Sequence, residues 1–249
     1  MNKYHDQLDS LLKDTLSVSK SINLKIWLES GTLLGCIRDK DYIPWDEDID
    51  FGSWSSSLNN EKYKKFKEKM IKKKYIITKI GNLITIRKPS FICYADINFF
   101  TKRDNMAVCR LFFPTTKIGR LFGRLVFLFT SKNIFKSLQF HESLIHKIVY
   151  IFIYYIFKFF IPFKSQKKIL NYLKKLKKKN SLDHSMKVPI KLLDKTRNIK
   201  FRNFTVPVPY RSSNLLKFRY GSDWKVSKPN WSPFIDDKTF VFLKKKNKP

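Results

Sequence analysis

Four carboxylates fall within the five residues 46–50 of a chain whose formal net charge is +31. Such a cluster repels itself unless a positive charge lies within it. Pro44 excludes a regular helix just before the cluster, and we expect a strand at 47–52. Residues two apart on a strand project from the same face, so Asp48 and Asp50 are placed to hold one divalent cation.

The composition indicates a folded chain with a strongly basic surface. Its 249 residues suffice for one large domain or two small ones, and the contents of 43% hydrophobic and 16% aromatic residues exclude a disordered chain. Lys and Arg number 51 against 20 Asp and Glu, which favours contact with anionic lipid headgroups or phosphorylated glycans. We rank nucleic acid lower, because the sequence has no zinc-finger spacing, RNP-like motif or basic region followed by heptads.

Cysteine and histidine usage gives no sign of a zinc site. Cys36, Cys93 and Cys109 are odd in number and form no CxxC pair, and the four histidines are scattered without an HExxH motif. We therefore expect a reducing compartment and no disulfide framework. The first residues contain no apolar signal-peptide core, so we expect a cytoplasmic protein and consider peripheral contact with the inner face of the cell membrane.

Residues 1–113 alternate between helical and strand patterns, which is typical of a mixed α/β unit. Gly81-Asn82 separates two short β-type runs and predicts a hairpin turn. We expect helices at 4–20, 33–38 and 59–74, and strands at 24–29, 47–52, 75–80, 83–87, 91–100 and 105–113.

The character of the chain changes near residue 114. The segments 121–129 and 148–157 are largely apolar, and the second is too short for the roughly 20 residues of a bilayer span. We favour an interfacial, re-entrant or buried core helix there. The lysine-rich run 167–179 fits either a lipid-headgroup patch or a solvated helix. We treat residues 1–249 as a single catalytic domain with a helical apolar and basic insertion at 114–180, and expect residues 181–249 to complete its active-site cleft.

Two neighbouring stretches carry a family resemblance. The sequence reads ESGTLLGCIR at 29–38 and IPWDEDIDFG at 43–52, and this combination resembles the signature of the LicD family. Members of that family are phosphocholine transferases of bacterial surface glycans and share a domain with fukutin and fukutin-related protein. The resemblance implies a nucleotidyltransferase-like fold, in which a mixed sheet is flanked by helices. It also implies a divalent metal and the transfer of a phospho-alcohol from a CDP-activated donor.

The residues support this chemistry independently of the family. In phosphoryl transfer the protein mainly positions the donor and neutralises charge, commonly with Mg²⁺ or Mn²⁺ held by oxygen ligands. Asp48 and Asp50 supply two ligands, and Asp96 is our candidate for the third because it is a lone acid in an apolar strand. The competing interpretation of Asp96 is a salt bridge to Arg87 or Lys88.

The other two acids of the cluster have weaker assignments. Asp46 shares the parity of Asp48 and Asp50, so we expect it to face the same cleft or to contact the metal ligands. Glu47 faces the other way, and we interpret it as a solvated or capping residue.

Donor-binding residues are expected just before the acidic strand. Ser30-Gly31-Thr32 lies where a strand gives way to a helix, and free N–H groups at a helix N-terminus bind phosphate. Arg38 could clamp the donor diphosphate, or equally pair with Asp39 or Asp46.

Two aromatic positions are also candidates. Trp45 is expected to pack in the wall of the cleft, and stacking on cytosine is the alternative. Tyr220 and Trp224 belong to the sequence FRYGSDW, which resembles a Tyr-Gly-x-x-aromatic element of the same family. They either close over the donor or anchor a turn.

Three hypotheses follow. The first is an enzyme that moves phosphocholine, ribitol phosphate or glycerol phosphate from a CDP-alcohol to a sugar hydroxyl of a cell-surface or lipid-linked glycan, releasing CMP. The second keeps the fold but transfers a nucleotide from an NTP and releases diphosphate. The third is a non-enzymatic basic protein of the membrane surface.

Overall fold

A computed structural model describes residues 3–113, 122, 125, 129, 144–179, 182–229, 231 and 236–242. The chain forms two compact units, one built from residues 1–111 and 184–249 and the other from residues 112–183. The insertion predicted at 114–180 falls within the second unit. The apolar segment predicted at 121–129 lies largely outside the described residues.

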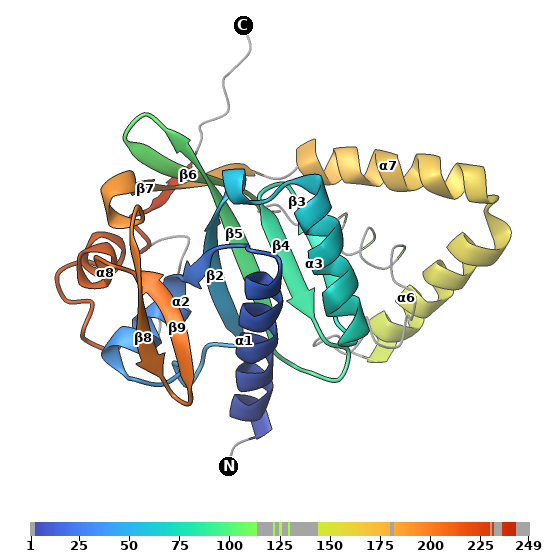
Figure 1. Ribbon diagram of the computed structural model, residues 1–249. Helices are drawn as coiled ribbons and strands as arrows, with labels where there is room; N and C mark the ends of the chain where they lie inside the picture. The colour runs from blue at the N-terminus through green and yellow to red at the C-terminus, as the bar shows by residue number, and fades with distance from the viewer. Residues whose placement is uncertain are drawn as a thin grey trace, which may run out of the picture. The chain divides into compact units, whose positions relative to one another are not determined.

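Helices and strands of the first unit alternate from its N-terminal end (Figure 1). Up to residue 113 they are α1 (Lys3–Ser21), β1 (Ile26–Leu28), α2 (Ser30–Arg38), β2 (Asp48–Trp54), the 3₁₀ turn η1 (Ser55–Ser57), α3 (Asn60–Lys72), β3 (Ile76–Ile80), β4 (Leu83–Arg87), β5 (Tyr94–Arg103) and β6 (Met106–Phe113). After the second unit they are β7 (Leu182–Pro189), the 3₁₀ turn η3 (Ile190–Leu192), β8 (Thr196–Phe201), β9 (Phe204–Pro209), α8 (Ser212–Tyr220) and β10 (Phe240–Phe242).

The strands form a mixed sheet, which confirms the predicted fold class. Among the described residues its order is β1-β2-β5-β6-β7-β10, and the hairpin β3-β4 joins it because β4 pairs with β5. Strands β2 and β5 run parallel, whereas β1 is antiparallel to β2, and β4 and β6 are antiparallel to β5. Strands β8 and β9 pair separately.

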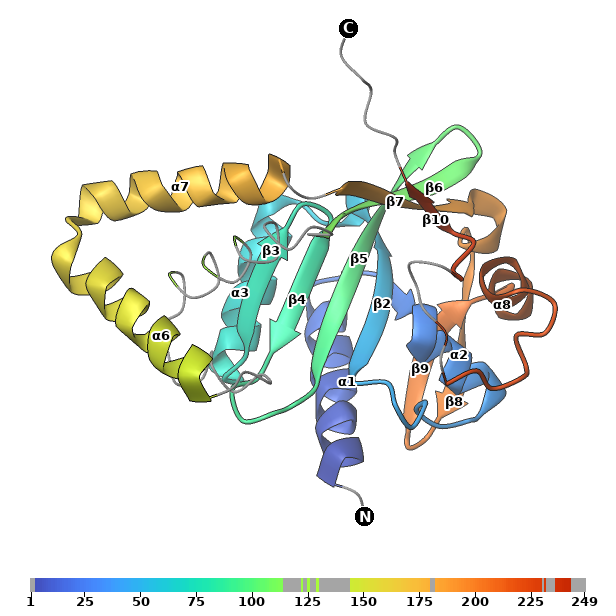
Figure 2. The same ribbon diagram turned by 180° about the vertical axis from the view of Figure 1, so that it is seen from behind.

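One face of the sheet supplies the hydrophobic core. Ile49, Phe51, Ala95 and Ile97 are fully buried on β2 and β5. Helices α1 and α3 cover this face, and α1 contacts both β2 and β5. In Figure 1 the two helices lie in front of the strands, and in Figure 2 the strands lie in front of the helices. Because strand side chains alternate, the even-numbered residues of β2 and β5 face away from these helices.

The predicted hairpin at 75–87 is confirmed. Strands β3 and β4 pair in register from Ile76 with Arg87 to Ile80 with Leu83. Gly81 has a φ of 58°, a left-handed conformation that glycine adopts without steric cost.

Strand β1 departs from its sequence pattern. Residues 24–29 alternate apolar and other side chains, which is typical of a strand with one solvated face. In the structure Trp27 is 1% exposed and Glu29 is 0% exposed, because the ring of Trp27 packs against those of Trp54 and Phe100 and the Glu29 carboxylate pairs with Arg219. Trp27 lies directly opposite Gly52, where a Cβ atom would come within 2.3 Å of the indole nitrogen. Gly52 is therefore required by the close approach of Trp27.

The second unit is built on two helices and a short π-helical turn. Its elements are α6 (Leu144–Tyr155), η2 (Ile156–Phe160) and α7 (Phe163–Lys179). Phe157 and Leu173 are buried together with Phe129, whose ring stacks on that of Phe157 at a centroid distance of 3.8 Å. In the part of the chain that the structure describes, we find no helix of sufficient length and apolarity to cross a bilayer.

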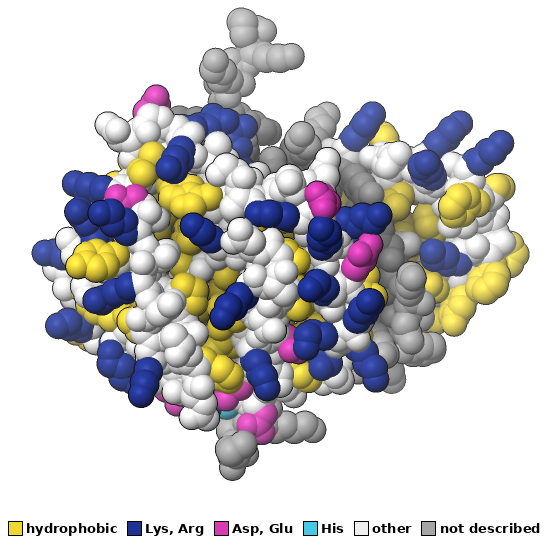
Figure 3. Space-filling view, in the orientation of Figure 1, with side chains coloured by type: hydrophobic (Ala, Val, Ile, Leu, Met, Phe, Trp, Pro, Cys, Tyr) yellow, Lys and Arg dark blue, Asp and Glu magenta, His cyan; other side chains and the backbone are white. Residues whose placement is uncertain are grey.

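Lysine and arginine side chains are spread over the face of the molecule seen in Figure 3, and acidic side chains on that face are few. This distribution agrees with the excess of 51 basic over 20 acidic residues.

Candidate functional site

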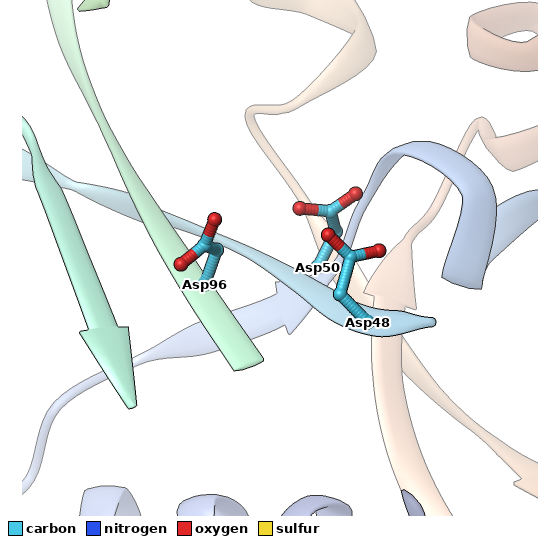
Figure 4. A group of neighbouring side chains, drawn as sticks. All are labelled: Asp48, Asp50 and Asp96. Atoms are coloured by element: carbon cyan, nitrogen blue, oxygen red, sulfur yellow. The ribbon is translucent and has the colours of Figure 1, made fainter. Parts of the chain in front are cut away.

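The structure brings three carboxylates together on the sheet face that points away from α1 and α3. Asp48 and Asp50 lie on β2 and Asp96 lies on β5, and Asp50 is paired in register with Asp96 on the parallel neighbour. Carboxylate oxygens from the three residues lie within 4.8 Å of one another (Figure 4). The spacing that first singled out Asp48 and Asp50 therefore places both on the same face, with Asp96 beside them.

The electrostatics of this acidic cluster are unfavourable in the protein alone. Burial and the charges of Asp48, Glu29 and Asp96 raise the pKa of Asp50 well above its ordinary value. Burial, together with the charge of Asp48, raises the pKa of Asp96 to about 6, although a hydrogen bond with Thr85 and the charge of Arg87 oppose this rise. Asp96 Oδ1 is also buried without a hydrogen-bond partner. Three half-buried carboxylates and an unpartnered oxygen form a donor set that suits a hard divalent cation such as Mg²⁺ or Mn²⁺.

Among the described residues, no salt bridge with Asp48, Asp50 or Asp96 is found. The competing assignment of Asp96 to an ion pair with Lys88 therefore receives no support, since the Lys88 ammonium lies over the rings of Tyr75 and Phe91. The Arg87 guanidinium lies over the ring of Tyr94, 4.4 Å from its centroid.

Asp46 lies between the acidic cluster and the start of α2. Its carboxylate is so close to Gly31 that a Cβ at that position would come within 2.2 Å of Asp46 Oδ2. Burial and the charge and hydrogen bond of Asp48 raise the pKa of Asp46 to about 8. Asp46 thus touches both the acidic strand and the helix N-terminus, whereas Glu47 is exposed.

The first turn of α2 consists of Ser30, Gly31 and Thr32, so the helix begins three residues earlier than predicted. Ser30 has a left-handed φ of 50°, and its hydroxyl donates to Glu29 Oε2 at 2.8 Å. The Thr32 hydroxyl accepts a hydrogen bond of 2.9 Å from the backbone N–H of Asp50. Thr32 therefore ties the helix to the acidic strand, and the backbone of this turn remains the part suited to bind phosphate.

Arg38 lies at the opposite end of α2 from Ser30, about 12 Å away along the axis of a straight helix. Its guanidinium makes two hydrogen bonds of 2.7 Å to the carboxylate of Asp39. The structure thus shows one of the two alternatives considered for Arg38, and its role in donor binding stays a prediction.

Tyr220 ends α8, and α8 packs against α2. The ring of Tyr220 lies 4.8 Å from that of Trp231, and the charges of Glu29 and Asp50 contribute to raising the pKa of its hydroxyl, after the dominant effect of burial. Trp224 is 8% exposed, and whether it closes over the donor or anchors a turn stays a prediction. Trp45 is 48% exposed, so it does not belong to the core, and its place in the wall of the cleft stays a prediction.

Sequence reasoning missed a buried ionic network next to the acidic cluster. Arg219 is 2% exposed and lies between two carboxylates, donating to Glu29 Oε1 at 2.5 Å and to Asp237 Oδ2 at 2.6 Å. Asp237 Oδ1 also accepts hydrogen bonds from the backbone and hydroxyl of Thr239. Glu29 directly precedes the first turn of α2, so this network joins α8 to the predicted phosphate-binding turn.

Tyr94 was also missed. It is paired with Asp48 across β2 and β5, and its side chain hydrogen-bonds that carboxylate. The signal was present in the sequence, because Tyr94 has the same parity as Asp96 on β5.

The mixed sheet flanked by helices is a nucleotidyltransferase-like fold. The family model of LicD/FKTN/FKRP, nucleotidyltransferase domain, matches residues 23–115, which include every strand of the acidic cluster. This stretch belongs to that domain family, as its resemblance at 29–52 predicted.

Individual relatives match over a shorter stretch. The uncharacterised protein RP689 of Rickettsia prowazekii is 49% identical over 45 residues, which cover 18% of this chain and 17% of that protein. Human ribitol 5-phosphate transferase FKRP is 40% identical over 45 residues, which cover 18% of this chain and 9% of that protein. The aligned stretch thus spans less than a fifth of either relative's length.

Two solved structures share a distant likeness. The crystal structure of ANT(2")-Ia in complex with adenylyl-2"-tobramycin matches with 14% identity and a TM-score of 0.31 over 41% of this chain and 54% of that one. Terminal uridylyl transferase 4 from Trypanosoma brucei with bound GTP matches with 13% identity and a TM-score of 0.30 over 42% of this chain and 32% of that one.

Proposed function

We propose that this chain is a metal-dependent phosphotransferase that moves a phospho-alcohol from a CDP-activated donor to a sugar hydroxyl of a cell-surface glycan. The observation that carries the proposal is the acidic cluster, in which oxygens of Asp48, Asp50 and Asp96 lie within 4.8 Å of one another. The family match of residues 23–115 supports a transferase, and the similarity to FKRP, whose name gives ribitol 5-phosphate as the transferred group, supports a phospho-alcohol.

The three aspartates would hold Mg²⁺ or Mn²⁺, which supplies charge neutralisation of a bound diphosphate. We expect the N–H groups in the first turn of α2 to receive a donor phosphate. Asp46 lies against this turn and would have to move aside or lose its charge for a phosphate to enter. Arg38, Tyr220 and Trp224 remain the proposed contacts to more distant parts of the donor.

The transfer itself exchanges the phosphoanhydride bond of the donor for a phosphoester bond to the acceptor. The acceptor hydroxyl oxygen attacks the donor phosphorus distal to cytidine, and a new P–O bond forms to the sugar. The bond between that phosphorus and the bridging oxygen breaks, and CMP leaves with the bonding electron pair. The hydroxyl proton passes to one of the three carboxylates.

The strong positive charge supports an anionic acceptor, such as a phosphorylated or lipid-linked glycan, because a basic surface attracts such substrates. Choline, ribitol and glycerol each fit the proposal as the alcohol of the donor.

The deciding experiment is product analysis. Purified protein is incubated with CDP-choline, CDP-ribitol, CDP-glycerol or an NTP, with and without Mn²⁺, and thermal shift identifies which nucleotide binds. We expect a CDP-alcohol to bind in the presence of metal and to release CMP upon addition of a glycan acceptor. Release of diphosphate from an NTP would instead establish nucleotidyl transfer. A melting temperature that Mn²⁺ does not change, whichever donor is present, would favour the non-enzymatic hypothesis.

A further inference from the structure

The second unit exposes an apolar surface at the junction of α6, η2 and α7. We define the aromatic tip as Phe152, Phe159, Phe160 and Phe163, whose exposures are 67%, 76%, 81% and 80%. Phe152 lies on α6, Phe159 and Phe160 lie on η2, and Phe163 begins α7, and all four are exposed, whereas Phe157 is buried in the core of the unit. Four exposed phenylalanines in one small unit are unusual for a surface in contact with water alone.

Aliphatic side chains continue this surface along α6. Ile148, Val149 and Ile156 are 59%, 47% and 39% exposed. Branched aliphatic side chains do not stack on nucleic acid bases, but they partition readily into hydrocarbon. The surface therefore suits acyl chains better than it suits a polynucleotide.

The charge around the tip has one sign only. Between Ser143 and Leu182 the sequence contains ten lysines and no arginine, aspartate or glutamate. Lys158 and Lys164 flank the aromatic tip, and both are exposed, as are Lys167 and Lys168 on the next turn of α7. In Figure 3 hydrophobic side chains gather at the end of this unit, with dark blue lysines beside them. A surface of this kind is complementary to anionic headgroups that lie above an apolar layer.

The length of the helical segment argues against insertion across a bilayer. Leu144–Phe160 comprises α6 and η2, which at about 1.5 Å per residue reach about 26 Å, less than the roughly 30 Å of a hydrocarbon core. Lys158 lies within this segment, and Ile161-Pro162 separates it from α7. The geometry fits a bent pair of helices that rests in the interface with the aromatic tip immersed.

We infer that the second unit is a peripheral membrane-binding element, which inserts the aromatic tip into an anionic lipid bilayer while the surrounding lysines contact its headgroups. Both contributions are needed for stable attachment, since apolar area and electrostatic attraction add in interfacial binding. This inference concerns α6–α7 alone and does not depend on the reaction proposed for the acidic cluster.

Vesicle sedimentation tests the inference directly. The wild-type chain is expected to bind phosphatidylcholine–phosphatidylglycerol vesicles at least about tenfold more strongly than pure phosphatidylcholine vesicles. Raising the salt from about 0.1 M to about 1 M shortens the Debye length from about 10 Å to about 3 Å and should weaken this binding. Equal binding to neutral and anionic vesicles would overturn the role given to the lysines.

Matched variants separate the tip from the rest of the surface. The triple variant Phe159→Ser, Phe160→Ser, Phe163→Ser should lose at least about tenfold in vesicle affinity, because interfacial affinity scales with buried apolar area. The control Ile92→Ser, Tyr210→Ser, Val226→Ser removes three exposed apolar side chains from the first unit and should bind as wild type. Likewise Lys164→Glu with Lys168→Glu should weaken binding more than Lys64→Glu with Lys67→Glu on α3.

A fluorescent label distinguishes insertion from mere proximity. The three native cysteines are all buried, so Phe160→Cys can be labelled selectively with an environment-sensitive dye. Its emission should shift to the blue on anionic vesicles, while a label at Tyr210→Cys should not respond.

Two results would overturn the inference. One is equal vesicle binding by the tip variant and its control, with circular dichroism showing both folded. The other is wild-type protein that ignores vesicles but self-associates, or binds an oligonucleotide, in a manner that the tip variant abolishes.

Discussion

The first unit contains two groups of buried or half-buried carboxylates that the protein treats differently. Glu29 and Asp237 lie on either side of Arg219, which is 2% exposed, and their charges raise its pKa despite its burial. The acidic cluster of Asp48, Asp50 and Asp96 makes no salt bridge among the described residues, and one oxygen of Asp96 has no partner. The first group is neutralised internally and serves the fold, whereas the second is the one that we propose to hold a divalent cation.

Removing one carboxylate from the acidic cluster is expected to have the largest effect of the changes considered. Asp50→Asn should lower phosphotransfer on the order of 100-fold or more, because metal ligation supplies several kcal/mol of transition-state stabilisation. The same change relieves repulsion, so the metal-free protein should melt at the same or a higher temperature. Glu47→Gln is the control, since Glu47 is exposed one residue from Asp48. Unchanged activity of Asp50→Asn on the true donor would remove the basis of the proposed function.

Removing the cation from the Glu29–Arg219–Asp237 network should destabilise the fold. Arg219→Met leaves Glu29 and Asp237 buried without a cation, and breaking a buried ion pair in this way costs about 3–5 kcal/mol. Urea unfolding would measure the loss of unfolding free energy. Adding Glu29→Gln and Asp237→Asn to the same chain should recover part of it, because the uncompensated charges are then gone. If Arg219→Met alone were as stable as wild type, Arg219 would not be the structural partner of these acids.

These two groups also differ in how far sequence could predict them. Asp48 and Asp50 follow from a spacing of two on a strand, and Asp96 from its isolation among apolar residues. The parallel pairing that sets Asp50 beside Asp96 is a property of sheet topology, which local patterns do not contain. The bond between Glu29 and Arg219 joins residues 190 positions apart, so no local pattern could have paired them.

Burial on both sides of β1 was unpredictable for a similar reason. The alternation at 24–29 correctly gave a strand, but Phe100 and Arg219, which contact Trp27 and Glu29, lie far away along the chain. The hairpin β3-β4 needed only its own turn residues, so it was predicted correctly, with bounds within a residue of those observed.

Metal binding to the acidic cluster should raise the free energy of unfolding by a smaller amount. Mn²⁺ at about 100 times its dissociation constant should stabilise the wild-type chain by about 2.7 kcal/mol, because it binds only the folded protein. Differential scanning fluorimetry would show this stabilisation as a rise in the melting temperature. The rise should be absent in Asp48→Asn and retained in Glu47→Gln. An equal shift in both variants would place the ion elsewhere.

The connection between α2 and β2 is expected to contribute less. Thr32→Val removes the acceptor of the Asp50 N–H, which is 2.9 Å from the hydroxyl, and an unsatisfied buried N–H costs about 1–3 kcal/mol. Thr32→Ser keeps a hydroxyl and is the matched control in urea unfolding. Activity should fall with Thr32→Val as well, since this bond positions a proposed ligand. Equal stability of the two variants would mean that the hydrogen bond is replaced by another partner.

The smallest expected effect comes from a third carboxylate, one paired at the surface. Burial opposes ionisation of Asp41, but hydrogen bonds from the Tyr42 N–H and the Arg202 guanidinium outweigh it and lower its pKa. A carboxyl group with a lowered folded pKa stabilises the protein above its unfolded pKa, and this contribution is lost as the pH falls through the folded value. Asp41→Asn should therefore flatten the acid limb of a stability–pH curve.

The side chain of Asp41 is 45% exposed, so solvent screening limits the effect to about 1 kcal/mol or less. If the curves of wild type and Asp41→Asn remained parallel through the acid range, the ion pair with Arg202 would contribute nothing to stability. Asp41 would then be held in place by the fold, with no stabilising role of the kind that Glu29 and Asp237 have beside Arg219.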